Sequence, residues 1–367
     1  MPHFLLAVVQ LQVIGDQSAL RTGGPAAREI GTLWNVMLLV GAIATLLTFS
    51  ALAYALFRNR KHDAALPEAD RPADARGELS NDEGGGRGLE GVGRPRSERI
   101  GVRAMVGAGI IAPAIILGVV LVSTFRALDA LTPPTAKAAA MGQPPVPGTV
   151  AIEIVGRQYW WRVRYLDAQP SNVFETANEL HIPLGVPVQL RLRSDDVIHS
   201  FWVPGLHGKM DLIPGRTNVM TLEADRAGIW RGQCAEFCGM QHTKMAFTVV
   251  AETTEKFEQW RSEQRLPSAA NDSGNREHLS GQATFMRAGC AVCHTVRGTM
   301  AGGRLGPDLT HIATRLTLAA GSFPNSAENM LRWITDPQSH KPGSAMPTVP
   351  LTAQELQLVA QYLQHLR

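Results

Sequence analysis

The chain of 367 residues is poor in cysteine and in net charge, and both shortages limit what it can be. Its 35 Lys and Arg residues nearly balance its 32 Asp and Glu residues. A formal net charge of only +3 excludes a nucleic-acid protein held by bulk positive charge. Four cysteines are too few for a disulfide scaffold in a chain of this length. Because they form two close pairs, each with a histidine nearby, they indicate metal or cofactor chemistry instead.

Two stretches of the sequence contain no charged residue. Residues 33–57 and 104–125 are apolar, and at about 1.5 Å per helical residue each is long enough to cross a bilayer core. The alternative is a pair of buried helices in a large soluble core. We predict a two-helix membrane hairpin over residues 31–127. Arg and Lys cluster at both ends of the polar segment 58–103, so this loop is predicted to be cytoplasmic and both chain termini to lie on the outer face.

Three further segments carry no clear periodic pattern. Residues 1–30 are predicted to be an N-terminal outer segment. Their apolar run from Phe4 to Val9 is short and follows no basic region, so the sequence leaves a degenerate signal and a surface segment both open. The Pro- and Ala-rich stretch 128–148 and the polar stretch 266–276 are predicted to be linkers.

Residues 149–265, between the linkers, consist of short runs in which apolar and polar residues alternate. Such runs, separated by Gly and Pro turns, predict a β-sandwich or barrel. The predicted strands are 150–155, 159–165, 188–193, 218–224, 228–233 and 246–252. A helix with Phe257 and Trp260 on one face closes this domain. Residues 277–367 have a helical pattern, in which Thr352 and Glu355 form a capping box before the last helix.

The first cysteine pair lies in a twelve-residue loop that also contains an imidazole and a thioether. This loop, Cys234-Ala-Glu-Phe-Cys238-Gly-Met-Gln-His242-Thr-Lys-Met245, offers soft ligands that select copper or zinc. Zinc would need a better fourth ligand than methionine, and a Cys234–Cys238 disulfide is the structural alternative. Methionine beside Cys and His favours copper. Two bridging thiolates can hold two copper ions, each needing its own histidine, and His199 on an earlier strand edge supplies the second.

Several motifs together resemble cytochrome c oxidase subunit II. They are the two spanning helices, Pro-Ala-Ile-Ile-Leu at 113–117, Asp-Val-Ile-His-Ser-Phe-Trp-Val-Pro at 196–204, Lys-Met-Asp-Leu-Ile-Pro-Gly-Arg at 209–216 and the cysteine loop. The similarity covers roughly residues 16–260. The resemblance implies a Greek-key cupredoxin barrel with a binuclear copper centre.

The same resemblance implies which atoms would hold each metal ion. One copper would take His199 and Met245, the other His242 and the main-chain carbonyl of Glu236, with Cys234 and Cys238 bridging both. The Glu236 carboxylate would also reach a magnesium ion at the contact with the large oxidase subunit.

Two positions depart from the family pattern. A glutamate found in many subunits II, seven residues before the proline of the first motif, is Val106 here. The aromatic patch for electron entry reads Tyr159-Trp160-Trp161 in place of Trp-Tyr-Trp. Asp195 and Asp196 are either a solvated strand end or an aid to cytochrome docking. Other His and Met residues have no family role and are expected to be surface or packing residues: His181, His207, Met210, Met240 and His278.

The second cysteine pair forms the haem c attachment motif Cys290-Ala-Val-Cys293-His294. In this motif two thioether bonds tether the porphyrin, and the histidine is the proximal iron ligand. The pentapeptide alone could also be a redox dithiol. Gly281 and Phe285 precede it on a predicted helix, and Gly-Pro-Asp-Leu-Thr-His-Ile follows at 306–312, as in class I cytochromes c. These surroundings favour a small all-α cytochrome c domain.

The haem iron would need a second axial ligand. Met346 lies on a predicted loop shortly before the last helix, 52 residues after His294, and we predict that it is this ligand. Met300 lies in a Gly-rich loop close to the attachment motif, and Met330 lies inside a helical run. Both are competitors, as is His311.

A covalent haem and a copper pair on one membrane-anchored, outward-facing chain would form an electron relay. Neither apolar stretch contains a histidine, so the chain offers no intramembrane ligand for an oxygen-reducing centre. We predict subunit II of a proton-pumping haem-copper oxidase of a bacterial plasma membrane. Electrons would pass through the fused haem and the copper pair to the oxygen site of subunit I, and Trp160 and Trp161 would line the contact between the two domains.

The predicted partners are subunit I, other membrane subunits, the lipid bilayer and an external electron donor. That donor would be a cytochrome c or a quinol-cytochrome c reductase complex. Two alternatives remain open. The chain could be the electron-entry subunit of a copper-containing nitric oxide reductase, or a membrane-tethered electron carrier or copper-delivery module with no enzyme attached.

Overall fold

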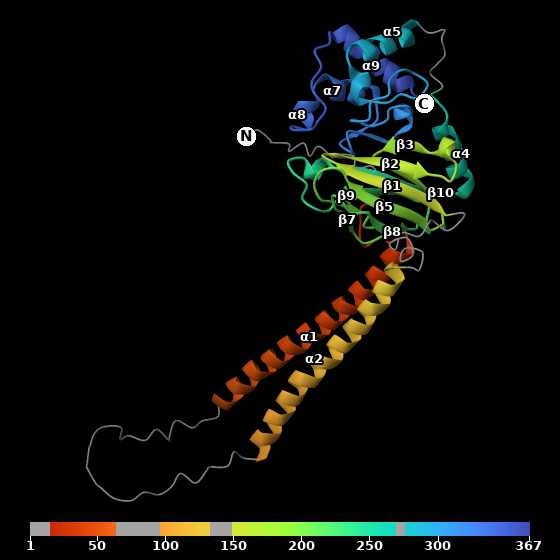
Figure 1. The fold of residues 1–367 in the computed structure, drawn as a ribbon. Coiled ribbons are helices and arrows are strands. Elements are labelled where there is room, and N and C mark those ends of the chain that lie inside the picture. Colours follow the sequence, from red (N-terminus) through yellow and green to blue (C-terminus); the bar gives the residue numbers. More distant parts are fainter. Residues whose placement is uncertain (1–14, 64–95, 133–148, 269–275) are drawn as a thin grey trace, which may run out of the picture. The chain divides into compact units, whose positions relative to one another are not determined.

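The computed structural model of the protein describes residues 15–63, 96–132, 149–268 and 276–367 (Figure 1). These residues form two compact units, one from Thr32 to Arg126 and one that combines the chain up to Gly31 with the chain from Ala127 onward. The predicted outer segment, cytoplasmic loop and two linkers lie partly outside the described residues, which omit 1–14, 64–95, 133–148 and 269–275.

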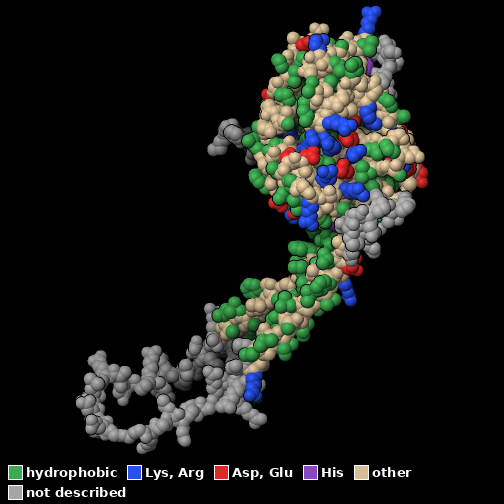
Figure 2. Space-filling model, in the orientation of Figure 1, with side chains coloured by type: hydrophobic (Ala, Val, Ile, Leu, Met, Phe, Trp, Pro, Cys, Tyr) green, Lys and Arg blue, Asp and Glu red, His purple; other side chains and the backbone are tan. Residues whose placement is uncertain are grey.

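The two predicted membrane spans lie on long helices, α1 (Pro25–Asp63) and α2 (Arg96–Leu131). Stretches of 33 and 21 residues on these helices are long and apolar enough to cross a membrane. Their large side chains point outward, and Leu46, Phe57 and Leu117 are each about two thirds exposed. Figure 2 shows that hydrophobic side chains cover both helices. Core helices of a soluble protein would bury such side chains, so this pattern favours spans in contact with lipid.

Residues 149–252 form two five-stranded sheets that enclose one hydrophobic core, which confirms the predicted β-sandwich. The first sheet has the order β3 (Phe174–Ala177), β2 (Trp160–Leu166), β1 (Val150–Arg157), β5 (Val188–Ser194), β8 (Asn218–Leu222). The second has the order β4 (Glu179–Pro183), β10 (Ala246–Glu252), β9 (Gly228–Cys234), β6 (His199–Trp202), β7 (Met210–Leu212). All six predicted strands are present. Strands β3, β4 and β7 were not predicted, and β6 was predicted only as a strand edge carrying His199.

The alternation of apolar residues decides which side chains fill the core between the sheets. On β5, Val188, Leu190 and Leu192 are fully buried, as their spacing of two predicts. Trp161 and Phe247 also lie inside the sandwich, with ring centroids 5.2 Å apart in an edge-to-face arrangement. The closing helix α4 (Thr254–Arg265) is present as predicted and buries Phe257.

Residues before the first membrane helix belong to the same compact unit as the β-sandwich. Asp16 forms an isolated bridge with Trp230 of β9, and its N–H and C=O pair with the backbones of Ile229 and Arg231, each at 2.9 Å. Gly23 N–H donates to Gly205 O at 2.7 Å. These contacts join the chain before α1 to the sandwich that follows α2.

The C-terminal residues form a small helical domain, as predicted. Its elements are α5 (Arg276–Arg287), α6 (Cys290–Cys293), β11 (Thr317–Leu318), β12 (Phe323–Pro324), α7 (Ala327–Thr335), α8 (Pro337–His340) and α9 (Ala353–His365). Helices α5 and α9 cross closely at Gly281, where a Cβ atom would lie 2.4 Å from Leu358 O. The predicted capping box is confirmed, because Thr352 and Glu355 each accept a hydrogen bond from the other's backbone N–H.

Candidate copper and haem sites

The residues predicted to bind copper meet at one end of the second sheet. Strand β9 ends at Cys234 and β6 begins at His199, and these strands are paired so that Phe201 lies opposite Cys234. The loop after β9 makes a short 3₁₀ turn at His242–Lys244 and returns through Met245 into β10, the other neighbour of β9. The sheet therefore joins a distant histidine to a local cysteine loop.

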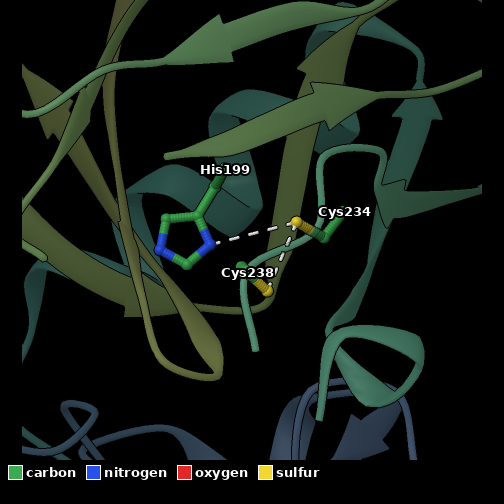
Figure 3. A group of neighbouring side chains, drawn as sticks. All are labelled: His199, Cys234 and Cys238. Carbon is green, nitrogen blue, oxygen red and sulfur yellow. Dashed lines mark hydrogen bonds between the residues drawn. The ribbon is translucent and has the colours of Figure 1, made fainter. Parts of the chain in front are cut away.

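Short distances connect the predicted ligand atoms into one cluster. The Cys234 and Cys238 Sγ atoms lie 3.8 Å apart, and His199 Nδ1 lies 3.9 Å from Cys234 Sγ (Figure 3). Cys238 Sγ lies 3.6 Å from His242 Nδ1 and 3.8 Å from Met245 Sδ. Cys234 Sγ lies 3.2 Å from the main-chain carbonyl oxygen of Glu236. Both cysteines are free thiols in this structure, with no disulfide between them.

His199 is held by groups that leave one ring nitrogen facing the sulfur atoms. Its Nε2 lies 2.7 Å from Asp196 Oδ1, while Nδ1 faces Cys234. A Cβ atom on Gly156 would lie 2.7 Å from the His199 ring, so this position needs glycine. Burial lowers the pKa of His199, but the hydrogen bonds to Asp196 and Cys234 outweigh it and raise the pKa. Asp196, predicted as a strand end or docking residue, thus orients a candidate ligand, as carboxylates beside metal-bound histidines do.

Only one of the two thiols, that of Cys234, loses its proton easily. The hydrogen bond from Cys238, followed by the one to His199, lowers the pKa of Cys234 to about 3 against the opposing effect of burial. The hydrogen bond with Cys234, then burial and the negative charge of Cys234, raise the pKa of Cys238. A thiolate next to a second thiol, two imidazoles and a thioether is a donor set that suits a soft metal such as copper.

The Glu236 side chain, predicted to reach magnesium, lies apart from the sulfur cluster. Its carboxylate is 45% exposed and pairs with Lys209 Nζ at 3.3 Å. Lys209 also lies 3.6 Å from Asp211 Oδ1. The Glu236 carboxylate is therefore free of the copper cluster and open to a partner surface, and its role towards magnesium stays a prediction.

The haem attachment motif forms the short helix α6, with His294 directly after it. His294 Nδ1 lies 2.9 Å from Pro307 O, which fixes the proton on Nδ1 and leaves Nε2 available for a metal. A Cβ atom on Gly306 would lie 2.6 Å from His294 Cε1, so the predicted Gly-Pro sequence is what lets the chain cover the ring. Burial lowers the pKa of His294, which favours the neutral form that can bind iron.

The candidates for the distal iron ligand differ in their surroundings. Met330 is buried on α7 in the core of the helical domain, as expected for a packing residue. Met300 is 92% exposed. The ring of His311 is tied to Leu266 O at 3.0 Å. Met346 lies half-buried between α8 and α9, where its main-chain carbonyl accepts a hydrogen bond from Gln338 at 2.6 Å, and it remains our predicted ligand.

Two of the three aromatic residues predicted for electron transfer, Trp160 and Trp161, occupy different environments. Trp161 is fully buried between the sheets, 6.1 Å from the His199 ring, so it does not line a contact between domains. The sequence signal was available, because Trp161 shares the inward face of β2 with Val163. Trp160 points the other way, beside the guanidinium groups of Arg157 and Arg162. Both arginines donate to main-chain carbonyls of the helical domain at Arg304 or Leu305.

Four of the residues expected to be packing or surface residues have the following surroundings. His207 is buried, His278 packs beside Tyr362, and Met240 is 72% exposed. His181 stacks on Trp260 with ring centroids 4.0 Å apart. It also bridges the carboxylates of Glu179 and Glu252, at 3.3 and 2.7 Å. This cluster is structural, because it joins β4 to β10 and α4.

Two family descriptions match separate parts of the chain. The periplasmic domain of cytochrome c oxidase subunit II matches residues 150–253, and cytochrome c matches residues 279–367. The cytochrome c oxidase subunit 2 of Alkalihalophilus pseudofirmus is 36% identical over 220 residues, which are 60% of this chain and 62% of the relative. That of Bacillus sp. (strain PS3) is 31% identical over 232 residues, 60% of this chain and 63% of the relative. The match thus spans about three fifths of these relatives' length.

Among solved structures, the periplasmic domain of subunit II of cytochrome oxidase from Bradyrhizobium japonicum is 27% identical. It covers 33% of this chain and 96% of its own chain, with a TM-score of 0.31.

The fold and the two clusters define the class of this protein as a helical hairpin carrying a cupredoxin-like domain followed by a cytochrome c domain. The family matches make the assignment specific. Residues 150–253 match the periplasmic domain of cytochrome c oxidase subunit II, and residues 279–367 match cytochrome c. The resemblance drawn from the sequence is confirmed.

Proposed function

We propose that this chain is subunit II of a proton-pumping haem-copper terminal oxidase and that it relays electrons through a fused haem c and a binuclear copper centre. The observation that carries the proposal is the convergence of six candidate copper donors within successive distances of 3.2–3.9 Å. These donors lie in the same compact unit as a haem attachment motif with an oriented histidine.

For copper, the chain supplies two bridging thiols and a different pair of terminal ligands for each ion. His199 and Met245 would hold one ion, and His242 with the Glu236 carbonyl would hold the other. Copper supplies one-electron redox chemistry when bound. The surrounding protein shields the donors from water, since Cys234, Cys238, His199 and Met245 are all buried. A donor set that is already in place needs little rearrangement between oxidation states, which is what rapid electron transfer requires.

For haem, Cys290 and Cys293 would carry the porphyrin and His294 and Met346 would be the axial ligands. Haem c also supplies one-electron chemistry. The Pro307 carbonyl holds the ring of His294, and a hydrogen bond of this kind tunes the basicity of an iron ligand. The two sites therefore have the same task, and a chain with both can pass electrons from one to the other.

The haem is the proposed entry point for electrons from an external donor, either a cytochrome c or a quinol-cytochrome c reductase complex. The side of the copper domain with Arg157, Trp160 and Arg162 is already in contact with the helical domain. Electrons would leave the copper centre for the oxygen-reducing site of subunit I, where proton pumping would also take place.

Membrane placement follows from the hairpin. Both cofactor domains would lie on the outer face of a bacterial plasma membrane, with the basic loop ends at the cytoplasmic side. The Glu236 carboxylate is exposed next to Lys209 and Asp211, so a magnesium ion shared with subunit I would require Glu236 to exchange its lysine partner for the metal.

Purification of the full-length chain with its membrane partners tests this function. We expect a multi-span haem protein to co-purify and the complex to reduce oxygen with electrons from a reduced cytochrome c. A chain ending at Leu266 should retain copper but show much lower turnover at low donor concentration, because the tethered haem domain acts at millimolar effective concentration. Replacing Tyr159 should matter less than this truncation. Nitric oxide reduction in place of oxygen reduction, or purification without any haem partner, would contradict the proposal.

A further inference from the structure

A lysine is buried at the contact between the helical domain and the copper domain. Lys341, directly after α8, is only 3% exposed. Its Nζ donates to the main-chain carbonyls of Tyr159, Lys244 and Ala319, at 2.9, 2.9 and 3.1 Å. Tyr159 and Lys244 belong to the copper domain and Ala319 to the helical domain. An ammonium group has three N–H donors, so each one has an acceptor here.

Two side chains of the copper loop donate hydrogen bonds to the residues on either side of Lys341. Gln241 Nε2 donates to Pro342 O at 2.9 Å, and Lys244 Nζ donates to His340 O. Residues 340–342 and 241–244 are therefore linked in both directions, and we call this contact the lysine clasp. Hydrogen bonds of this density fix the orientation of two surfaces more firmly than apolar contact does.

A strained turn of the helical domain completes the clasp. Ala319 and Ala320 have φ values of +51° and +57°, in the left-handed region that disfavours alanine. Ala319 O accepts from Lys341, and Ala320 O accepts from the N–H of Ala246 at 3.0 Å. The unfavourable backbone thus presents two successive carbonyls, one to the lysine and one to the copper domain. Strain of this kind persists where surrounding contacts enforce it.

Both segments of the lysine clasp lie close in sequence to proposed metal ligands. On the copper side, Gln241 and Lys244 flank His242, and Lys244 directly precedes Met245. On the haem side, Pro342 lies four residues before Met346. A shift of the clasp would therefore move a copper-binding loop against a haem-binding loop.

Burying this cation is costly, which argues against simple packing. Burial, followed by the nearby positive charge of Lys244, lowers the pKa of Lys341 to about 7, and all three hydrogen-bond acceptors are neutral carbonyls. A leucine or methionine would fill the same space without that cost. The advantage of a lysine at this position is that its three N–H donors bind three carbonyls in fixed directions and so hold the two domains in one orientation.

We propose that Lys341 is a positioning residue for electron transfer from haem to copper, acting by locking the helical domain onto the copper loop through the lysine clasp. This inference rests on the proposed function. It predicts that loss of the Lys341 donors slows transfer between the two sites while each site keeps its own cofactor and spectrum.

The test uses the full-length chain in detergent, loaded with copper and haem. A photoexcited ruthenium complex reduces the haem, and optical absorption follows the transfer of that electron to copper. Lys341→Met keeps the length of the side chain but removes every donor. We expect the rate of transfer to fall about tenfold. The reason is that loss of the charge-assisted hydrogen bonds lowers the fraction of chains in which the two domains are correctly docked. Lys341→Gln keeps an amide donor and should lie between Lys341→Met and wild type.

Two controls separate positioning from other effects. Lys256→Met removes a lysine from an exposed position of α4 and should leave transfer unchanged. Gln241→Ala removes the copper-side donor to Pro342 and should also slow transfer. Because both variants act on one contact, Gln241→Ala combined with Lys341→Met should lose less than the product of the two single effects.

Several outcomes would overturn the proposal. Wild-type transfer in Lys341→Met with normal spectra would do so, as would effects that multiply in the double variant. Slower transfer accompanied by a lower melting temperature or by altered copper and haem spectra would show a structural role only. If Lys341→Met does not fold, wild-type rates in both Lys341→Gln and Gln241→Ala would contradict it. Missing copper or haem signals in the wild type would instead refute the proposed function.

Discussion

Replacing Asp196 by asparagine tests how the structure prepares His199 for a metal. The Asp196 carboxylate lies 2.7 Å from His199 Nε2 and accepts the backbone N–H groups of Gln158 and Val197, both at 2.7 Å. These hydrogen bonds, led by that of His199, lower the pKa of Asp196 despite its partial burial. An asparagine is neutral and has a single acceptor oxygen, so it cannot satisfy all three groups.

We expect Asp196→Asn to weaken copper binding by roughly 10- to 100-fold, as loss of an orienting carboxylate does elsewhere. That range equals about 1.4–2.8 kcal/mol of binding free energy. Titration of the copper-loaded full-length chain with a competing chelator measures it, and EPR reports any change in the copper environment. The haem spectrum should not change.

Asp195→Asn is the matched control. It removes the same charge from the neighbouring position, but Asp195 pairs with Arg157 at 2.5 Å and not with the histidine. Copper affinity should therefore remain near the wild-type value. If both variants lost affinity equally, the effect would be one of general charge, and if neither did, the role assigned to Asp196 would be refuted.

Three further predictions address other parts of the chain. Gly306→Ala should displace the ring of His294 and alter the haem spectrum while leaving the copper EPR signal unchanged, because its Cβ would lie 2.6 Å from Cε1. Met346→Ala should keep the haem attached but change its axial ligation and potential, and the reverse result, with Met300→Ala as the effective variant, would reject our assignment. Burial lowers the pKa of His181, but two glutamates outweigh this and raise it, so its charged form stabilises the fold. That contribution is complete below the ordinary value of 6.5 and is lost as the pH rises through the raised pKa. The difference in melting temperature between wild type and His181→Gln should therefore shrink as the pH rises through the raised pKa of His181.

The cysteine loop could be predicted from the sequence because its chemistry is local. Cys234, Cys238, His242 and Met245 lie within twelve residues, so the soft donor atoms can be recognised as one set from the sequence alone. The capping box and the six predicted strands follow from equally local patterns.

The groups that hold these ligands in place were not predictable in the same way. Asp196 reaches His199 through a turn whose geometry depends on contacts with Gln158, 38 residues away. The acceptors of Lys341 come from positions 22, 97 and 182 residues distant. No sequence period connects such positions, and only the packing of the folded chain, within and between the domains, defines them.

The electron relay itself is tested most directly by the optical and EPR spectra of the purified full-length chain, together with its metal content. The account predicts one haem that stays attached after denaturation, two coppers per chain and a mixed-valence copper signal shared between two ions. Cys234→Ser should abolish that signal and leave the haem, since a hydroxyl is a poor copper ligand. A chain that binds zinc or a single copper, or that holds no covalent haem, would contradict the account.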